Sequence, residues 1–171
     1  MIIPSEQYDQ ILKTMPIPCV DLLVVDNEGY ILLLKRKNEP AKGQWWFPGG
    51  RVHYKETRRE AAIRKLKEEC GLEPIEIQEL GTFDVMLENP LNSSIVHGIT
   101  TLFCMKISSH DGFHLDNQSI DCDWKTLKEW GKTTLPSFVT KIFMHLLGGS
   151  NIRKTTMISK NRNVFNKVED G

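Results

Sequence analysis

The segment from Gly50 to Leu72, GRVHYKETRREAAIRKLKEECGL, constrains this chain more than any other. Its fixed residues follow the spacing G-x5-E-x7-R-x-U-x-E-E-x-G-U, in which U is an aliphatic residue. Six of these positions require one residue type each, so a chance match in a chain of this size has a probability on the order of one in 10^5. The matching residues are Gly50, Glu56, Arg64, Leu66, Glu68, Glu69, Gly71 and Leu72.

The second half of this segment predicts a helix over about residues 57–70. Thr57 is a suitable N-cap residue, and Gly71 supplies a left-handed end. Glu68 and Glu69 lie about 100° apart around such a helix, so we expect one carboxylate to face a site and the other to lie at its margin. The structural alternative is a solvated helix whose glutamates only pair with the basic residues one turn earlier.

The loop before the helix, FPGGR at residues 47–51, favours the functional interpretation. At Gly49 and Gly50 a backbone without side chains could approach a phosphate group or offer a carbonyl to a cation. Mg²⁺ is normally held by one or two carboxylates, a backbone carbonyl and substrate oxygens. The sequence therefore predicts a Mg²⁺ site, in which Mn²⁺ could replace Mg²⁺.

Composition and charge exclude several other classes. Lys and Arg together number 22, as do Asp and Glu, so nothing indicates binding to nucleic acid or to a membrane surface. An apolar content of 40% is sufficient for one globular domain. The cysteines are widely spaced, and we expect them to be reduced in a cytoplasmic protein rather than to form a zinc site or disulfides. They are Cys19, Cys70, Cys104 and Cys122.

Helical and strand patterns alternate irregularly, which predicts an α/β protein with a mixed sheet between helices. We expect a single domain over residues 1–149 and a polar, basic tail over residues 150–171 that is loosely ordered. Helices are predicted at residues 5–14, 57–70 and 136–147. Strands are predicted at residues 20–25, 30–36, 45–47, 75–88, 95–107 and 122–125.

With the preceding stretch KRKNEPAKGQWWFPGGRV at residues 35–52, the pattern resembles the Nudix hydrolase superfamily, and within it the GDP-mannose mannosyl hydrolases. The likeness extends over about residues 3–130. It implies a Nudix fold, with a mixed β-sheet sandwiched between helices. It also implies Mg²⁺-dependent hydrolysis of a nucleoside diphosphate linked to another group, and a homodimer.

The resemblance implies that Mg²⁺ is bound by the Gly49 carbonyl, Glu69 and Gln118. Glu68 is a further candidate ligand, because it restores a second carboxylate where the subgroup has a small apolar residue. The glutamate that ordinary Nudix enzymes carry after the arginine is Lys65 here. A lysine cannot ligate a cation, so we expect one metal ion rather than several. The alternative is that the Lys65 side chain points away from the site, where its charge has no effect on metal binding.

Two further roles follow from the same resemblance. Arg36 and Arg51 would contact the diphosphate, for which a guanidinium offers forked donors. Asp21 would stabilise charge near the sugar, although a buried salt bridge is an equal alternative for a carboxylate inside an apolar strand. Trp45 and Trp46 are adjacent and point to opposite faces of a strand, so one is expected in the core. The other, with Trp46 as the candidate, could stack on a nucleobase, and the alternative is that both pack in the core or an interface.

The general base is the main departure from the subgroup. Its histidine is replaced by Ser119, which cannot accept a proton unaided at neutral pH. His97 and His114 are the candidates that could substitute, although a lone histidine is more often a surface or hydrogen-bonded group.

The leading functional hypothesis is a hydrolase of nucleotide sugars in which water attacks sugar C1 and releases a nucleoside diphosphate. The alternative within the family is a diphosphohydrolase of nucleoside triphosphates or other nucleoside diphosphate derivatives. A third hypothesis is a nucleotide-sugar-binding module with little activity, because Lys65 and Ser119 each remove a proton acceptor.

Overall fold

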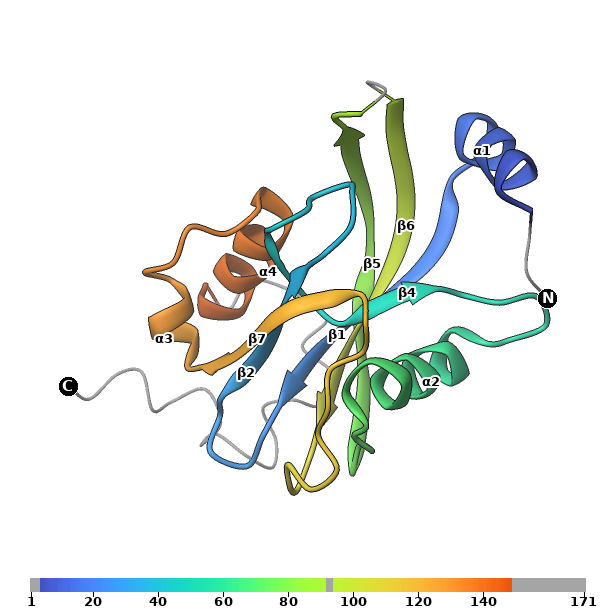
Figure 1. The fold of residues 1–171 in the computed structure, drawn as a ribbon. Coiled ribbons are helices and arrows are strands. Elements are labelled where there is room, and N and C mark those ends of the chain that lie inside the picture. Colours follow the sequence, from blue (N-terminus) through green and yellow to red (C-terminus); the bar gives the residue numbers. More distant parts are fainter. Residues whose placement is uncertain (1–3, 92–93, 149–171) are drawn as a thin grey trace.

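The structure is a computed structural model that describes residues 4–91 and 94–148 (Figure 1). The predicted tail at residues 150–171 lies outside the described residues, as do residues 92–93 between the two long predicted strands. Four helices are described: α1 (Ser5–Thr14), α2 (Arg58–Cys70), α3 (Leu127–Trp130) and α4 (Ser137–Leu147). None of the described helices is long and apolar enough to cross a membrane.

Seven strands form one mixed sheet at the centre of the described region. They are β1 (Ile17–Val25), β2 (Ile31–Arg36), β3 (Trp45–Trp46), β4 (Gly49–Arg51), β5 (Glu76–Asn89), β6 (Ser94–Lys106) and β7 (Ser119–Lys125). The main path through the sheet is β3-β2-β1-β6-β5, with β4 paired to β1 and β7 paired to β2. β1 runs parallel to β6, and the other pairs are antiparallel.

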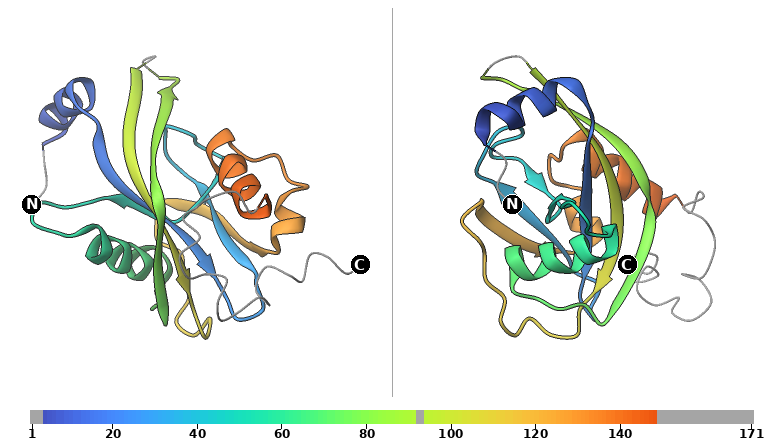
Figure 2. Two further views of the ribbon diagram at one scale, coloured as in Figure 1. Left: turned by 180° about the vertical axis from the view of Figure 1, so that it is seen from behind. Right: turned by 90° about the vertical axis from the view of Figure 1, so that its right-hand side faces the viewer.

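Alternate residues of β1 build two cores on opposite faces of the sheet. Leu22 and Val24 belong to a core that includes the inner face of α2. Leu23 and Val25 belong to a second core that includes α4. Because side chains alternate along a strand, the almost continuous apolar sequence of β1 is the pattern of a strand covered on both sides. Figure 2 shows α2 and α4 on opposite sides of the sheet, which confirms the predicted α/β arrangement.

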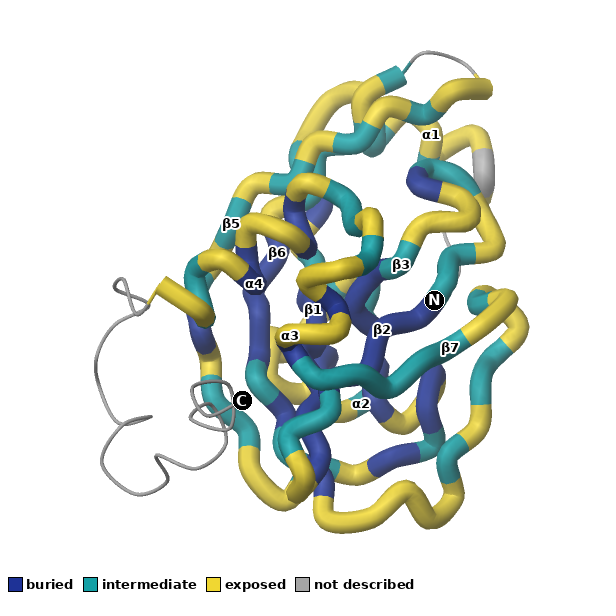
Figure 3. Tube along the Cα trace, turned by 90° about the vertical axis from the view of Figure 1, so that its left-hand side faces the viewer, coloured by how far each residue is buried: buried dark blue, intermediate teal, exposed yellow. Residues whose placement is uncertain are grey.

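Burial decreases from the central strands outward. Figure 3 shows buried segments gathered in β1 and β2, whereas α1 and the far ends of β5 and β6 are exposed or only partly buried. The predicted helix at residues 5–14 is confirmed, and α1 contacts β6 near that exposed end.

The predicted helix after the glycine loop is confirmed, with Thr57 as N-cap and Arg58 as first helical residue. The side chain of Thr57 accepts from the Glu60 N–H, and the Glu60 carboxylate accepts from the Thr57 N–H. Gly71 ends the helix in the left-handed conformation, with φ at 68°. Both ends of α2 are therefore set by residues that a helix terminus favours.

The carboxyl end of α2 is tied to a distant loop. The His114 N–H donates to the Cys70 carbonyl (3.1 Å), and the Asp116 N–H donates to the Glu69 carbonyl (3.2 Å). A side chain at Gly71 would overlap Gly112 and the ring of His114. This contact positions the loop that leads to Gln118.

Replacement of Gly71 tests this connection. Gly71→Ala combines a left-handed backbone with overlap, so it should lower the free energy of unfolding by about 3 kcal/mol. Gly43→Ala is the matched control, because Gly43 has a φ of 75° and open space around it; its cost should be about 1 kcal/mol. Urea unfolding of both variants measures the difference, and equal losses would contradict a tight contact at Gly71.

Candidate active site

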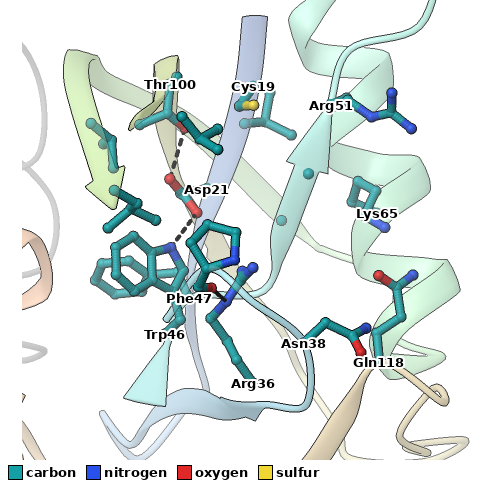
Figure 4. A pocket seen from close by; sticks show the side chains of 18 of the residues that line it. Cys19, Asp21, Arg36, Asn38, Trp46, Phe47, Arg51, Lys65, Thr100 and Gln118 are labelled. Atoms are coloured by element: carbon teal, nitrogen blue, oxygen red, sulfur yellow. Dashed lines mark hydrogen bonds between the residues drawn. The ribbon is translucent and has the colours of Figure 1, made fainter. Parts of the chain in front are cut away.

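One cavity of about 590 Å³ opens where the central strands meet the glycine loop and α2. Residues of α1, β1, β2, β4, α2, the β5–β6 hairpin and the start of β7 line it. Figure 4 shows this cavity from close by. The sequence-predicted residues on its wall include Asp21, Arg36, Gly49, Arg51, Glu69 and Gln118.

Gly49 and Gly50, predicted as a loop, instead form a short strand on β1. Gly49 is the partner of Asp21 in this antiparallel pair, and a side chain at Gly49 would overlap the Val20 carbonyl. The Gly49 N–H points away from β1 and donates to Glu69 Oε2 (3.0 Å). Since the N–H and C=O of one strand residue point to the same side, the Gly49 carbonyl also faces away from β1.

Glu69 lies inside the cavity wall, and Glu68 lies at its margin. The side chain of Glu69 is 10% exposed and that of Glu68 is 49% exposed. Burial raises the pKa of Glu69, while the Lys65 ammonium opposes that rise. Glu69 Oε1 lies 2.6 Å from Lys65 Nζ, and Glu68 Oε2 lies 3.5 Å from the same nitrogen. The alternative of an outward-pointing Lys65 is therefore wrong.

Glu56 and Arg64, two further residues of the pattern at residues 50–72, stabilise this wall. Arg64 donates through Nε to Glu56 Oε1 (2.6 Å) and through Nη2 to Glu56 Oε2 (2.8 Å). The same guanidinium reaches the Arg51 carbonyl and Glu68 Oε2, both at 3.0 Å. The hydrogen bonds from Arg64 lower the pKa of Glu56 to about 2. Glu56 and Arg64 therefore connect the glycine loop to α2.

Asp21 is a buried carboxylate that faces the cavity from β1, with 7% of its surface exposed. Trp46 Nε1 donates to Oδ1 (3.1 Å) and Thr100 Oγ1 donates to Oδ2 (2.7 Å). Burial raises the pKa of Asp21 to about 6, and these two hydrogen bonds oppose the rise. Both direct partners are neutral donors. Asp21 is therefore held by two hydrogen bonds and not by the salt bridge considered from sequence.

Trp46 is buried, at 5% exposure. Its ring stacks on Phe138 with centroids 5.5 Å apart, and the Arg36 guanidinium lies 6.0 Å from its centroid. Because so little of the ring is exposed, Trp46 offers almost no surface on which a nucleobase could stack. What Trp46 contributes to the site is the N–H that fixes Asp21.

The two arginines approach the cavity from different elements. Arg36, at the end of β2, donates from Nε to the Pro40 carbonyl (2.9 Å). Burial lowers the pKa of Arg36, while the charges of Asp21 and Glu69 oppose that shift. Arg51, in β4, is exposed, and its guanidinium lies 4.2 Å from the centroid of the Tyr8 ring in α1. Both side chains therefore have neighbours that orient them.

The structure brings Gln118 to the cavity but not the two histidines predicted as substitute bases. His97 lies on the outer side of the β5–β6 hairpin, where it bonds Asp84 (2.9 Å). The physical reason is strand alternation: its neighbours in β6 line the cavity, so its own side chain points to the other face. His114 bonds a carbonyl within its own loop. His53, which was not predicted as a base, lies on the cavity wall.

Thr100 was also missed, and no sequence signal could have found it. It lies 79 residues from Asp21 and meets it only because β6 runs parallel to β1. The inward direction of Lys65, in contrast to the position of Thr100, has a signal in the sequence. Lys65 lies four residues before Glu69, which is the spacing of an ion pair on a helix.

The oxygen atoms around Glu69 are suitable ligands for a hard divalent cation. Among the described residues no group of three or more His, Cys, Asp or Glu side chains could hold a metal by itself. Mg²⁺ does not require such a group, because one or two carboxylates, a carbonyl and substrate phosphates are sufficient. Each oxygen of Glu69 has one donor and retains capacity for another partner. Glu69, the Gly49 carbonyl and Gln118 therefore form a chemically suitable set, with Glu68 beside them.

Comparisons with known proteins agree with this arrangement. The family model described as NUDIX domain matches residues 15–137. The low-salt glycan biosynthesis protein Agl8 of Haloferax volcanii is 35% identical over 126 residues, which cover 74% of this chain and 78% of Agl8. The ADP-ribose pyrophosphatase of Methanocaldococcus jannaschii is 37% identical over 84 residues, 49% of this chain and 47% of that protein.

Solved structures share the fold. The MutT protein from Methanosarcina mazei Go1 has a TM-score of 0.66 at 25% identity, over 77% of this chain and 94% of that one. The NUDIX domain of Shewanella oneidensis NrtR, complexed with ADP ribose, has a TM-score of 0.65 at 18% identity, over 84% of this chain and 98% of that one.

The Glu56–Arg64 pair predicts a pH-dependent stability. The depressed pKa means that the contribution of Glu56 is present above its ordinary pKa of 4.5 and is lost as pH falls toward about 2. Glu56→Gln should therefore be less stable than wild type near neutral pH, and the difference should shrink between about pH 5 and pH 2. Urea unfolding across this range measures it. A difference that is independent of pH would show that the pair does not stabilise the fold through charge.

Proposed function

This chain belongs to the Nudix family, and we propose that it is a Mg²⁺-dependent hydrolase of nucleotide sugars, with GDP-mannose or GDP-glucose as the substrates to test first. In this proposal water attacks C1 of the sugar, and the nucleoside diphosphate is the leaving group. The homodimer implied by the subgroup resemblance stays a prediction.

The observation that carries the proposal is the position of Gly49 between two buried carboxylates. Its N–H donates to Glu69, and a Cβ atom at Gly49 would lie 3.1 Å from Asp21 Oδ1. A diphosphate bound at the glycine loop would therefore bring the group attached to it close to Asp21. A carboxylate at that place favours a sugar that develops positive charge, as an oxocarbenium-like transition state does.

The remaining residues support departure of the diphosphate. Arg36 and Arg51 would donate to phosphate oxygens and neutralise the charge that grows as the C1–O bond breaks. Glu69, the Gly49 carbonyl and Gln118 would hold Mg²⁺, which supplies further charge stabilisation at the phosphates when it is bound.

The base that accepts a proton from water must reach the cavity. His53 lines the cavity, whereas His97 and His114 do not. His53 therefore replaces those two histidines as our candidate, and its exposed position at the rim is compatible with proton exchange with solvent.

A second candidate function is cleavage between phosphates by attack of water on phosphorus. Two observations favour it: Glu68 adds a carboxylate next to Glu69, and several relatives are named pyrophosphatases or pyrophosphohydrolases. The chain covers about half the length of these relatives, 47% and 52%. The third candidate, a binding module with little activity, follows from Lys65 and Ser119.

Hydrolysis of GDP-mannose in ¹⁸O-labelled water with Mg²⁺ separates these functions. We expect the label in free mannose and none in the GDP, because water attacks carbon and the diphosphate leaves intact. Mass spectrometry of both products locates the label.

Label in GMP or in mannose 1-phosphate would contradict attack at carbon and support the diphosphohydrolase. If neither nucleotide sugars nor nucleoside triphosphates are turned over, the binding module is supported instead. Glu69→Gln is the control for background hydrolysis, because it removes the charge of the central candidate ligand.

A further inference from the structure

Stability alone does not explain why the side chain of Lys65 is buried. The residue is 8% exposed, although it stands on the wall of an open cavity. Its stem crosses Gly50: a Cβ atom there would lie 2.9 Å from Cε and 3.4 Å from Nζ of Lys65. The absence of a side chain at Gly50 therefore leaves the room in which the ammonium lies beside the glycine loop.

The ammonium is held by both adjacent carboxylates. It lies 2.6 Å from Glu69 Oε1 and 3.5 Å from Glu68 Oε2, one helical turn away in each case. A buried ammonium is costly unless it is paired, and the same holds for the carboxylate of Glu69. Lys65 thus cancels one of the two negative charges that would otherwise attract divalent cations to this face of α2.

An ammonium has three N–H donors. The two glutamates accept at most two of them, so a third remains for an acceptor in the cavity. Arg51 lines the same cavity, and Figure 4 shows Lys65 between Arg51 and Gln118. An anionic group at the glycine loop would be placed to accept from this cation.

We propose that Lys65 is a built-in cation of the diphosphate site, which takes the place of one divalent metal ion by holding Glu69 and donating to a phosphate oxygen of the substrate. The inference rests on the proposed function for the presence of a diphosphate. It assigns Lys65 a binding role that a glutamate at this position could not perform.

Removing the charge of Lys65 should change the affinities for metal and for nucleoside diphosphate in opposite directions. Lys65 competes with a divalent cation for Glu69, so Lys65→Met should tighten metal binding. Lys65 also attracts phosphate oxygens, so the same variant should weaken binding of a nucleoside diphosphate in the absence of metal. A role in packing alone would not move these two affinities in opposite directions.

The test measures Mn²⁺ binding by electron paramagnetic resonance of free Mn²⁺, and GDP binding in excess EDTA by calorimetry. Wild type should bind one Mn²⁺. Lys65→Met should bind one Mn²⁺ about tenfold more tightly, and GDP without metal about tenfold more weakly. Lys65→Glu, which places three carboxylates on one face of α2, should bind two Mn²⁺.

Matched variants keep the result interpretable. Lys67→Met is the control, because Lys67 lies on the same helix and pairs with the exposed Glu73 outside the cavity; it should leave both affinities unchanged. Lys65→Arg retains the charge and should bind GDP in EDTA within about threefold of wild type. If Lys65→Met fails to fold by circular dichroism, Lys65→Arg and Lys65→Glu still decide the stoichiometry and the metal-free affinity.

Equal Mn²⁺ stoichiometry and affinity in wild type, Lys65→Met and Lys65→Glu would overturn the proposal while leaving the proposed function intact. Unchanged GDP affinity in EDTA for Lys65→Met and Lys65→Glu would overturn the phosphate contact. If no variant and no wild-type protein binds Mn²⁺, with or without GDP, the metal-dependent function itself fails, and Lys65 has no metal to replace.

Discussion

The site depends on one close approach, that of the Gly49 backbone to β1 at Asp21. A side chain at Gly49 would overlap β1, so only glycine lets β4 pair there. This pairing turns the Gly49 N–H toward Glu69 on α2 and leaves the Asp21 carboxylate beside the same residue. The glycine backbone of β4 thus connects one carboxylate at the centre of the sheet to another on α2.

Burial of charge is concentrated at this place. The buried charged residues of the described ranges are Asp21, Asp26, Lys65 and Glu69, and three of the four line the cavity. Such groups cost free energy unless they are paired, and stability would be served as well by apolar side chains. We therefore attribute the pairing of Lys65 with Glu69, and the hydrogen bonds that Trp46 and Thr100 donate to Asp21, to the proposed function rather than to stability.

Local sequence patterns predicted most elements of the fold but not how distant elements meet. The helix from Thr57 onward followed from its cap and its terminal glycine, because those signals are local. β4 was missed because two glycines indicate a loop until a partner strand is known. His97 was misplaced because the face that a strand residue occupies depends on register. The meeting of Thr100 with Asp21 needed the parallel pairing of β1 and β6, which no local pattern contains.

The central claim is that a single divalent cation and the Lys65 ammonium share the phosphates of the substrate. The most direct measurement is an anomalous difference map from crystals grown with Mn²⁺ and GDP. We expect one Mn²⁺ peak beside Glu69 and the Gly49 carbonyl, with Lys65 Nζ within hydrogen-bonding distance of a phosphate oxygen. Two Mn²⁺ peaks along Glu68 and Glu69, or a Lys65 side chain turned into solvent, would contradict the account.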